Sequence, residues 1–135
     1  VAALKDSGIR VSLFIEPEEK QIEAAAAIGT DVIELHTGAY CERALEEDAK
    51  GLALEMERLR NAARIAAEAG LEVHAGHGLT YNTVSPVARI PQIVELNIGH
   101  FLIGEAIFGG LHSAVRRMRA LMDEARASVT GRKIA

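Results

Sequence analysis

Several features that would assign this sequence to a particular class of protein are missing from it. It has no Trp and a single Cys, Cys41, so no disulfide can form within the chain, and a reducing cytoplasm is the expected compartment. The most apolar stretch, HFLIGEAIFGG, is interrupted by Glu105 and is too short to span a membrane, and no signal peptide is visible. With 15 basic and 19 acidic residues, the formal net charge is −4, without the positive excess typical of nucleic-acid binding. We therefore expect a cytoplasmic protein with no membrane or nucleic-acid partner.

The residues that are present favour one α/β domain. The chain has 135 residues, of which 49% are hydrophobic, and stretches typical of strands alternate with stretches typical of helices. The predicted strands are residues 9–16, 31–38, 71–78 and 93–100. The predicted helices are residues 18–29, 44–69 and 111–128, with short helical pieces before Pro91 and after Gly99 and the end of a helix at residues 1–8. This alternation predicts a parallel sheet, and we expect the chain to begin within a fold.

The faces of the predicted strands indicate a barrel rather than an open sheet. Successive side chains of a strand point to opposite faces, so Ile33 and Leu35 share one face while Glu34 and His36 share the other. The side chain of Asn97 likewise points to the face opposite the apolar residues of its own strand. An open doubly wound sheet is usually apolar on both faces, because helices cover both. A barrel accepts polar residues near its C-terminal mouth, where barrel enzymes carry their chemistry, so these faces favour a barrel.

The strongest candidate for catalysis is His77, at the end of the third predicted strand. Gly76 and Gly78 on either side allow a ligand to approach closely, and an imidazole transfers protons near neutral pH. Alternation places His77 on the side of Val73 and points His74 the opposite way, toward the covering helices. The alternative for His77 is a core histidine held by backbone hydrogen bonds. For His74 we prefer that buried, hydrogen-bonded role.

Glu34 and His36 form a second candidate group on the neighbouring strand. A carboxylate inside a barrel is costly to desolvate and is more often retained for acid-base chemistry. The alternative is an internal ion pair or a structural hydrogen bond, and the role of His36 stays open. Cys41 carries only a weak indication of function, and His112 is expected at the surface or in a helix cap.

A phosphate site is predicted after the fourth strand. Gly99 leaves the strand and a short apolar helix follows at once from His100. A glycine ahead of a helix N-terminus exposes backbone N–H groups, and the helix dipole favours an anion there. Barrels commonly bind phosphate between the loops after their last two strands and a short extra helix, and GHGLTYNT and GHFLIG occupy the corresponding places. The alternative is a loop that merely turns.

Three stretches, in this order and spacing, closely resemble the C-terminal half of the pyridoxine 5′-phosphate synthase family: LFIEPEEKQIEAAAAIGTDVIELHTGAYC, AGHGLTYNTV and ELNIGHFLIGEAIFGGL. The resemblance implies a (β/α)8 TIM barrel of which residues 1–135 supply about the last four βα units, the N-terminal half of the domain being absent from this chain. The implied reaction condenses 3-amino-2-oxopropyl phosphate with 1-deoxy-D-xylulose 5-phosphate to give pyridoxine 5′-phosphate, phosphate and water. It implies no metal or organic cofactor, and a homo-oligomer.

The resemblance also implies roles for individual residues. The histidine of AGHG is the family's general acid, which places that role on His77. Gly78, Gly99 and His100 match positions that contact the phosphate-bearing amino ketone. Glu34, in IELHTG, falls in the active site with an acid-base or orienting role. The family's other catalytic residues lie on the early strands of the barrel, which residues 1–135 do not include.

Two other functions stay open on the sequence. One is a non-catalytic, phosphate-binding half-barrel that acts as a scaffold. The other is a different phospho-sugar barrel enzyme, such as an epimerase or isomerase. An epimerase would need its own acid-base pair on different strands, whereas AGHGLTY and ELNIGH together favour the synthase.

Overall fold

The computed structural model describes residues 1–130, in which strands and helices alternate along the chain. The strands are β1 (Ser12–Ile15), β2 (Val32–His36), β3 (Glu72–Gly76) and β4 (Ile93–Asn97). The helices are α1 (Ala2–Asp6), α2 (Glu19–Ala27), α3 (Gly38–Leu45), α4 (Ala49–Glu68), α5 (Val84–Ala88), α6 (His100–Gly109) and α7 (Leu111–Thr130). None of these helices has the length and hydropathy needed to cross a membrane.

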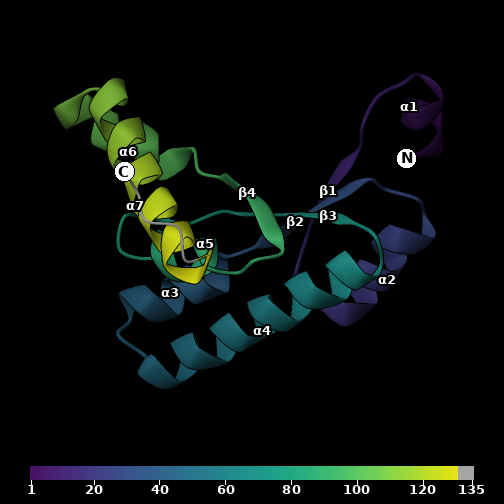
Figure 1. Ribbon diagram of the computed structural model, residues 1–135, viewed down its shortest axis with the longest axis horizontal. Coiled ribbons are helices and arrows are strands. Elements are labelled where there is room, and N and C mark those ends of the chain that lie inside the picture. Colours follow the sequence, from purple (N-terminus) through teal and green to yellow (C-terminus); the bar gives the residue numbers. More distant parts are fainter. Residues whose placement is uncertain (131–135) are drawn as a thin grey trace.

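The four strands form one parallel sheet in the order β1-β2-β3-β4 (Figure 1). Each strand pairs with the next along the chain, and Leu13, Ile33, Val73 and Ile93 lie in register across the sheet. Parallel neighbours require crossover connections, which the helices between the strands provide. The predicted α/β fold with a parallel sheet is therefore confirmed.

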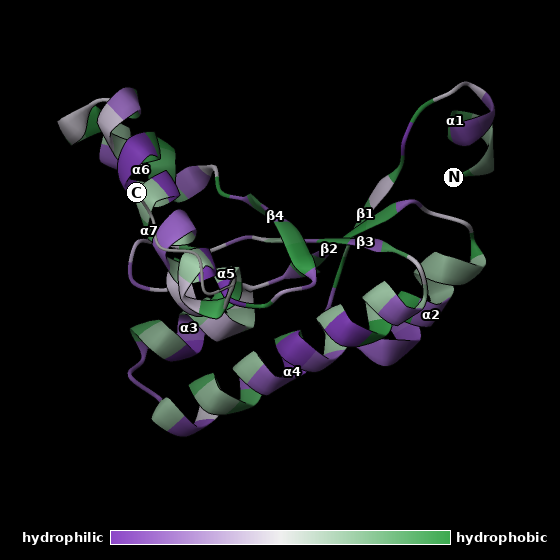
Figure 2. Cartoon of the chain, viewed as in Figure 1, coloured by the Kyte–Doolittle hydropathy of each residue, from purple (hydrophilic) through white to green (hydrophobic). Residues whose placement is uncertain are grey.

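One face of the sheet carries the hydrophobic core. In Figure 1, α2 and α4 run along the same side of the strands, and Figure 2 shows the apolar colour concentrated on the strands and on parts of these helices. Ile33, Leu35 and Val73 point into this core and are 1% exposed or less. The buried side chains of α4 are Met56, Leu59, Ala62, Ala63 and Ala66. Full burial of a Leu or Ile side chain stabilises the fold by about 2 kcal/mol, so this face holds the sheet and helices together.

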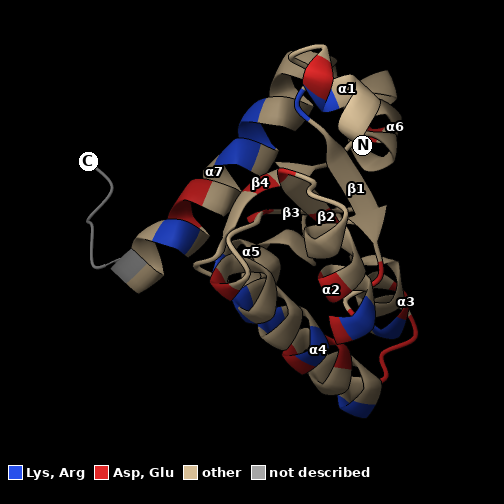
Figure 3. Cartoon of the chain, turned by 90° about the vertical axis from the view of Figure 1, so that its right-hand side faces the viewer, with Lys and Arg blue, Asp and Glu red and all other residues tan. Residues whose placement is uncertain are grey.

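Helix α4 also shows how local sequence determines where a helix begins and which face is solvated. The carboxylate of Asp48, at the N-cap, accepts a hydrogen bond from the backbone N–H of Gly51 at 3.0 Å. On the outer face, Arg64 and Glu68 form an ion pair one turn apart at 2.6 Å. Figure 3 shows Lys, Arg, Asp and Glu gathered along α4 and α7, with the strands mostly uncharged.

The other face of the sheet is polar and open to solvent. Phe14, Glu34, His74 and Glu95 lie side by side across it in register. Phe14 is 56% exposed, and the side chain of Glu95 is 58% exposed. The predicted separation of Glu34 from the apolar face is therefore confirmed. A parallel sheet with helices on one face and polar side chains on the other is the architecture of half a (β/α)8 barrel, whose inner face carries the polar residues.

The single helix predicted over residues 44–69 is wrong at its start, because the stretch after the second strand is itself helical. Gly38–Leu45 form α3 instead, and the long helix begins at Ala49 rather than near Ala44. The break falls at Glu47, whose φ of 56° lies in the left-handed region and ends the first helix before the Asp48 cap. The apolar periodicity of this stretch continues through the break and therefore does not reveal it.

The predicted direction of His74 is also wrong. His74 is in register with Glu34 and with Glu95, so it lies on the polar face and not toward the helices. Its Nε2 lies 2.8 Å from a carboxylate oxygen of Glu72 and its Nδ1 lies 3.3 Å from one of Glu95. The residue is 8% exposed, so the predicted buried, hydrogen-bonded role is confirmed.

Candidate active site

A cavity of about 710 Å³ opens where the strands end on the polar face. Its lining residues are Phe14, Glu34, His77, Gly78, Leu79, Thr80, Asn97, Ile98, Gly99, His100 and Phe101. The structure thus brings all five residues predicted for the site into one cavity, namely Glu34, His77, Gly78, Gly99 and His100. Cavities of a few hundred cubic ångströms bind small molecules, and barrel enzymes place their chemistry at this end of the strands.

His77 follows the last residue of β3 and has an unusual backbone conformation. Its φ is 77° and that of Gly78 is 83°, both in the left-handed region. This conformation costs a residue with a side chain on the order of 1–2 kcal/mol, so neighbouring contacts must hold it. The ring of His77 lies on the polar side, with centroid separations of 4.8 Å from His36 and 6.2 Å from Phe14. The predicted placement of His77 on the side of Val73 is therefore wrong, because alternation ends with the strand.

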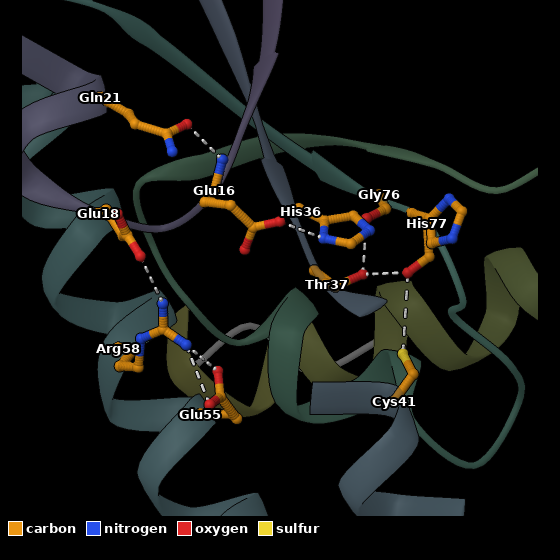
Figure 4. Close-up of polar contacts among 10 residues, drawn as sticks. All are labelled: Glu16, Glu18, Gln21, His36, Thr37, Cys41, Glu55, Arg58, Gly76 and His77. Carbon is orange, nitrogen blue, oxygen red and sulfur yellow. Dashed lines mark hydrogen bonds and ion pairs between the residues drawn. The ribbon is translucent and has the colours of Figure 1, made fainter. Parts of the chain in front are cut away.

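Thr37, directly after β2, holds this turn (Figure 4). Its side chain is fully buried, and its hydroxyl oxygen lies 2.8 Å from the carbonyl oxygen of Gly76 and 2.6 Å from that of His77. The backbone N–H of Thr37 also donates to the Gly76 carbonyl at 2.8 Å. The sequence analysis missed Thr37, although its position after His36, in the "LHTG" motif, places it next to the end of β3.

His36 lies beside His77 and is held by a carboxylate (Figure 4). Its Nδ1 is 2.8 Å from Oε1 of Glu16, the residue directly after β1. The ring of Phe14 meets that of His36 edge-on at a centroid separation of 5.1 Å. Sequence patterns do not reveal Glu16, because a glutamate before Pro17 has the composition of an ordinary turn.

Glu34 lies over the end of β3 with its carboxylate oriented by a neighbour. The side-chain amide of Asn97 donates to Oε2 of Glu34 at 2.8 Å. The other oxygen lies so close to Gly76 that a Cβ at that position would overlap it. Gly76 is therefore required for the approach of Glu34. It is also required for the close passage of the Asn97 backbone, because the Asn97 carbonyl oxygen would lie 2.7 Å from a Cβ at position 76.

Gly99 and His100, which also line the cavity, form the start of α6. Gly99 is the N-cap residue, and its carbonyl accepts the N–H of Ile103 at 3.0 Å. In any α-helix the first N–H groups have no acceptor within the helix, and a helix start of this kind can bind an anion. The predicted short helix after the fourth strand is confirmed, and the cavity reaches its first turn.

Cys41 lies on the far side of the His77–Gly78 turn, in a second cavity of about 570 Å³. Its Sγ is 3.9 Å from the His77 carbonyl oxygen and 3.9 Å from the hydroxyl of Thr83. Burial raises the pKa of the Cys41 thiol, which therefore stays protonated at neutral pH and is a poor nucleophile. The contacts of Cys41 support the His77–Gly78 turn. They do not strengthen the weak indication of function that the sequence carries for Cys41.

The titratable side chains that line the main cavity are Glu34, His77 and His100. Carboxylates and imidazoles can donate and accept protons near neutral pH, while the N-terminus of α6 can hold an anion nearby. Within residues 1–130, no three His, Cys, Asp or Glu side chains come close enough together to hold a metal ion. The arrangement is suited to proton transfer on an anchored, anionic small molecule.

Residues 1–124 match the family model described as pyridoxal phosphate biosynthesis protein PdxJ. The chain belongs to this family. Relatives named pyridoxine 5′-phosphate synthase include that of Ruegeria pomeroyi, 60% identical over 94% of this chain and 51% of the relative. That of Caulobacter sp. (strain K31) is 61% identical over 95% of this chain and 51% of its own length, and that of Rhodospirillum rubrum is 61% identical over 93% and 49%.

The chain spans about half the length of these PdxJ-family relatives. The residues matched by the family model include all five predicted site residues, together with Glu16, His36 and Thr37. The predicted resemblance to this family is therefore confirmed.

Proposed function

We propose that this chain is the C-terminal half of a pyridoxine 5′-phosphate synthase. The enzyme would condense 3-amino-2-oxopropyl phosphate with 1-deoxy-D-xylulose 5-phosphate to give pyridoxine 5′-phosphate, inorganic phosphate and water. The name of the relatives, pyridoxine 5′-phosphate synthase, supports formation of this product. The observation that carries the proposal is the convergence of Glu34, His77 and the Gly99–His100 helix start on one cavity.

The proposed domain is a complete (β/α)8 barrel of which residues 1–135 form the second half. The sheet order leaves β1 and β4 as edge strands, each with a free side for a further strand. The exposed polar face, with Phe14 and Glu95 more than half open to solvent, would become the barrel interior once four more strands close it. The cavity would then be enclosed at the C-terminal mouth.

In this proposal, the five predicted site residues of the cavity have defined roles. His77 acts as a general acid, and Glu34 accepts or relays protons during the condensation, dehydration and ring closure. Gly78, Gly99 and His100 bind the phosphate of the amino ketone, the glycines by letting the anion approach backbone N–H groups. No protein amine is required, because the amino ketone brings its own nitrogen.

We further propose that the protein forms a homo-oligomer in the cytoplasm and acts on small phosphorylated substrates. The observation that supports oligomer formation is the apolar surface of α6, where Ile103, Ile107 and Phe108 are 59%, 77% and 92% exposed. Exposed apolar patches of this kind commonly mark contacts between subunits. The single cysteine is typical of a reducing compartment.

The proposal is tested with the full-length protein that contains these residues. It is incubated with both substrates, and pyridoxine 5′-phosphate and inorganic phosphate are measured over time. Formation of the two products in equal amounts would support the synthase. Conversion of 1-deoxy-D-xylulose 5-phosphate to an isomer in the absence of the amino ketone would support an epimerase or isomerase instead. Binding of phosphate without turnover of either substrate would support a scaffold.

A further inference from the structure

The Glu16–His36 pair is the best-defined polar arrangement near the cavity that the proposed roles do not use. His36 Nδ1 and Glu16 Oε1 are 2.8 Å apart, and the His36 side chain is only 26% exposed. Glu16 is itself anchored, because its backbone N–H donates to the side-chain oxygen of Gln21 at 3.0 Å (Figure 4). A pair assembled in this way from the ends of β1 and β2 has a fixed position in the fold.

The ring of His36 is packed against that of His77 with little room to move. The two centroids are 4.8 Å apart and the ring planes are tilted by 50°. Both rings lie over Gly38, where a Cβ would come within 2.8 Å of Nε2 of His36 and 3.3 Å of Cδ2 of His77. Of the two histidines, His77 contributes to the lining of the cavity, so His36 can influence the chemistry through His77.

The chemistry of the pair favours orientation. An ionised carboxylate can only accept hydrogen bonds, so Nδ1 of His36 must carry the proton that is shared with Glu16. A carboxylate on one ring nitrogen holds the plane and the tautomer of an imidazole. Apolar side chains would pack equally well against His77, and they would avoid the desolvation of two polar groups.

We propose that Glu16 and His36 are a positioning pair for His77, an inference that rests on the proposed function. Glu16 fixes the plane of the His36 ring, and that ring holds the His77 imidazole at the cavity. His77 needs this support because its left-handed backbone is strained and Thr37 restrains only its carbonyl group. Small displacements of a proton-transfer group lower the rate strongly while leaving substrate binding nearly unchanged.

The test compares Glu16→Leu and Glu16→Gln with Glu23→Leu, a matched control at an exposed glutamate on α2. In the full-length protein, Glu16→Leu should lower kcat by roughly tenfold, the usual effect of losing a group that orients an active-site histidine, with KM changed by less than about twofold. Glu16→Gln keeps an acceptor for Nδ1 and should retain most of kcat. Glu23→Leu should behave as the unsubstituted protein. If Glu16→Leu retains full kcat, or if KM changes and kcat does not, the pair does not position His77.

Two further measurements distinguish a loss of positioning from a failure to fold and from a failure of the proposed function. His36→Phe retains a ring beside His77 but loses the contact with Glu16, and it is the test to use if Glu16→Leu fails to fold. A drop in kcat with His36→Phe then supports the positioning pair, and a full kcat overturns it. Nuclear Overhauser contacts between the His36 and His77 ring protons should be present in the unsubstituted protein and lost in Glu16→Leu. Without pyridoxine 5′-phosphate formation by the unsubstituted protein, the proposed function fails, and these ring contacts still decide whether Glu16 holds the two rings together.

Discussion

The hydroxyl oxygen of Thr37 lies 2.6 Å from the carbonyl oxygen of His77, a residue 40 positions further along the chain. This contact joins the end of β2 to the first residue beyond β3. It restrains a histidine whose φ of 77° few side chains adopt. The position of the proposed proton donor therefore depends on a buried hydroxyl of the neighbouring strand as well as on its own strand.

Replacing Thr37 with Val should separate the effect of this hydrogen bond from the effect of packing, because the two side chains have nearly the same shape. The buried carbonyl of Gly76 and the carbonyl of His77 both lose their side-chain donor, so we expect unfolding free energy to fall by about 1–3 kcal/mol. Turnover should fall as well, since the His77 turn can relax. Thr37→Ser keeps the hydroxyl and should restore most of both quantities. Urea unfolding and turnover of the three proteins check this, and equal stability of Val and Ser variants would contradict it.

Gly76→Ala tests the close approach of Glu34 to β3. The added methyl group would overlap Oε1 of Glu34 and lie 2.7 Å from the carbonyl oxygen of Asn97. Glu34 must then move away from the side-chain amide of Asn97, so we expect turnover to fall and stability to drop by about 1–3 kcal/mol. Gly104→Ala is the control, because that position in α6 is open and a helical alanine should stabilise by roughly 0.5–1 kcal/mol. Similar effects of the two substitutions would contradict the overlap.

The parallel sheet and the convergence of the site could be predicted from the sequence for a simple reason. Glu34 and Asn97 alternate with apolar neighbours, and the carboxyl ends of parallel strands meet at one edge, which brings Glu34, His77 and Gly99 together. Alternation does not say which face the helices cover, however, and His74 was placed on the wrong side for that reason. It also ends where the strand ends, so it cannot place the ring of His77.

The supporting residues were beyond the reach of local patterns. Thr37 and Glu16 act through partners 40 and 20 positions away, respectively, and their neighbours in the sequence resemble ordinary strand ends and turns. The left-handed conformation of His77 likewise depends on tertiary contacts, because histidine adopts it more often than most residues but still only in a small minority of cases. Sequence periodicity indicates which residues gather at the site, and tertiary contacts decide how they are held.

Tyr40 should titrate separately from an ordinary tyrosine. Burial raises the pKa of Tyr40 to about 12, and its hydroxyl donates to the Thr83 carbonyl at 3.2 Å. Because the folded state holds this proton more tightly than the unfolded state, the stabilisation from Tyr40 is complete below pH 10.0 and is lost as pH rises toward about 12. Phenolate absorbance should show a step near pH 12 that Tyr40→Phe lacks. A titration curve unchanged by that substitution would show that Tyr40 is not shielded.

The start of α6 should bind phosphate. In a crystal of the full-length protein grown with phosphate or sulfate, we expect the anion within hydrogen-bond distance of backbone N–H groups between Gly99 and Leu102, with Gly78 nearby. Inorganic phosphate should also raise the melting temperature, and the rise should grow with the logarithm of phosphate concentration once that concentration exceeds the Kd of the site. Commitment of these N–H groups to acceptors within the protein, with no melting shift, would mean that the loop merely turns.

The paired substitutions His77→Asn and His74→Asn test the central assignment in the full-length protein. Asparagine keeps some hydrogen bonding at His77 but cannot act as a general acid, so turnover should fall by roughly two to four orders of magnitude. Binding of the amino ketone phosphate should weaken much less, because in the proposed site backbone N–H groups hold the phosphate. His74 instead contacts the carboxylates of Glu72 and Glu95, on the polar face and away from the cavity lining. His74→Asn should therefore lower the melting temperature while sparing the rate per folded molecule.

Turnover, substrate affinity and melting temperature are measured for both variants. An active but destabilised His77→Asn protein would show that His77 ends its strand for packing, and that the proton donor lies elsewhere.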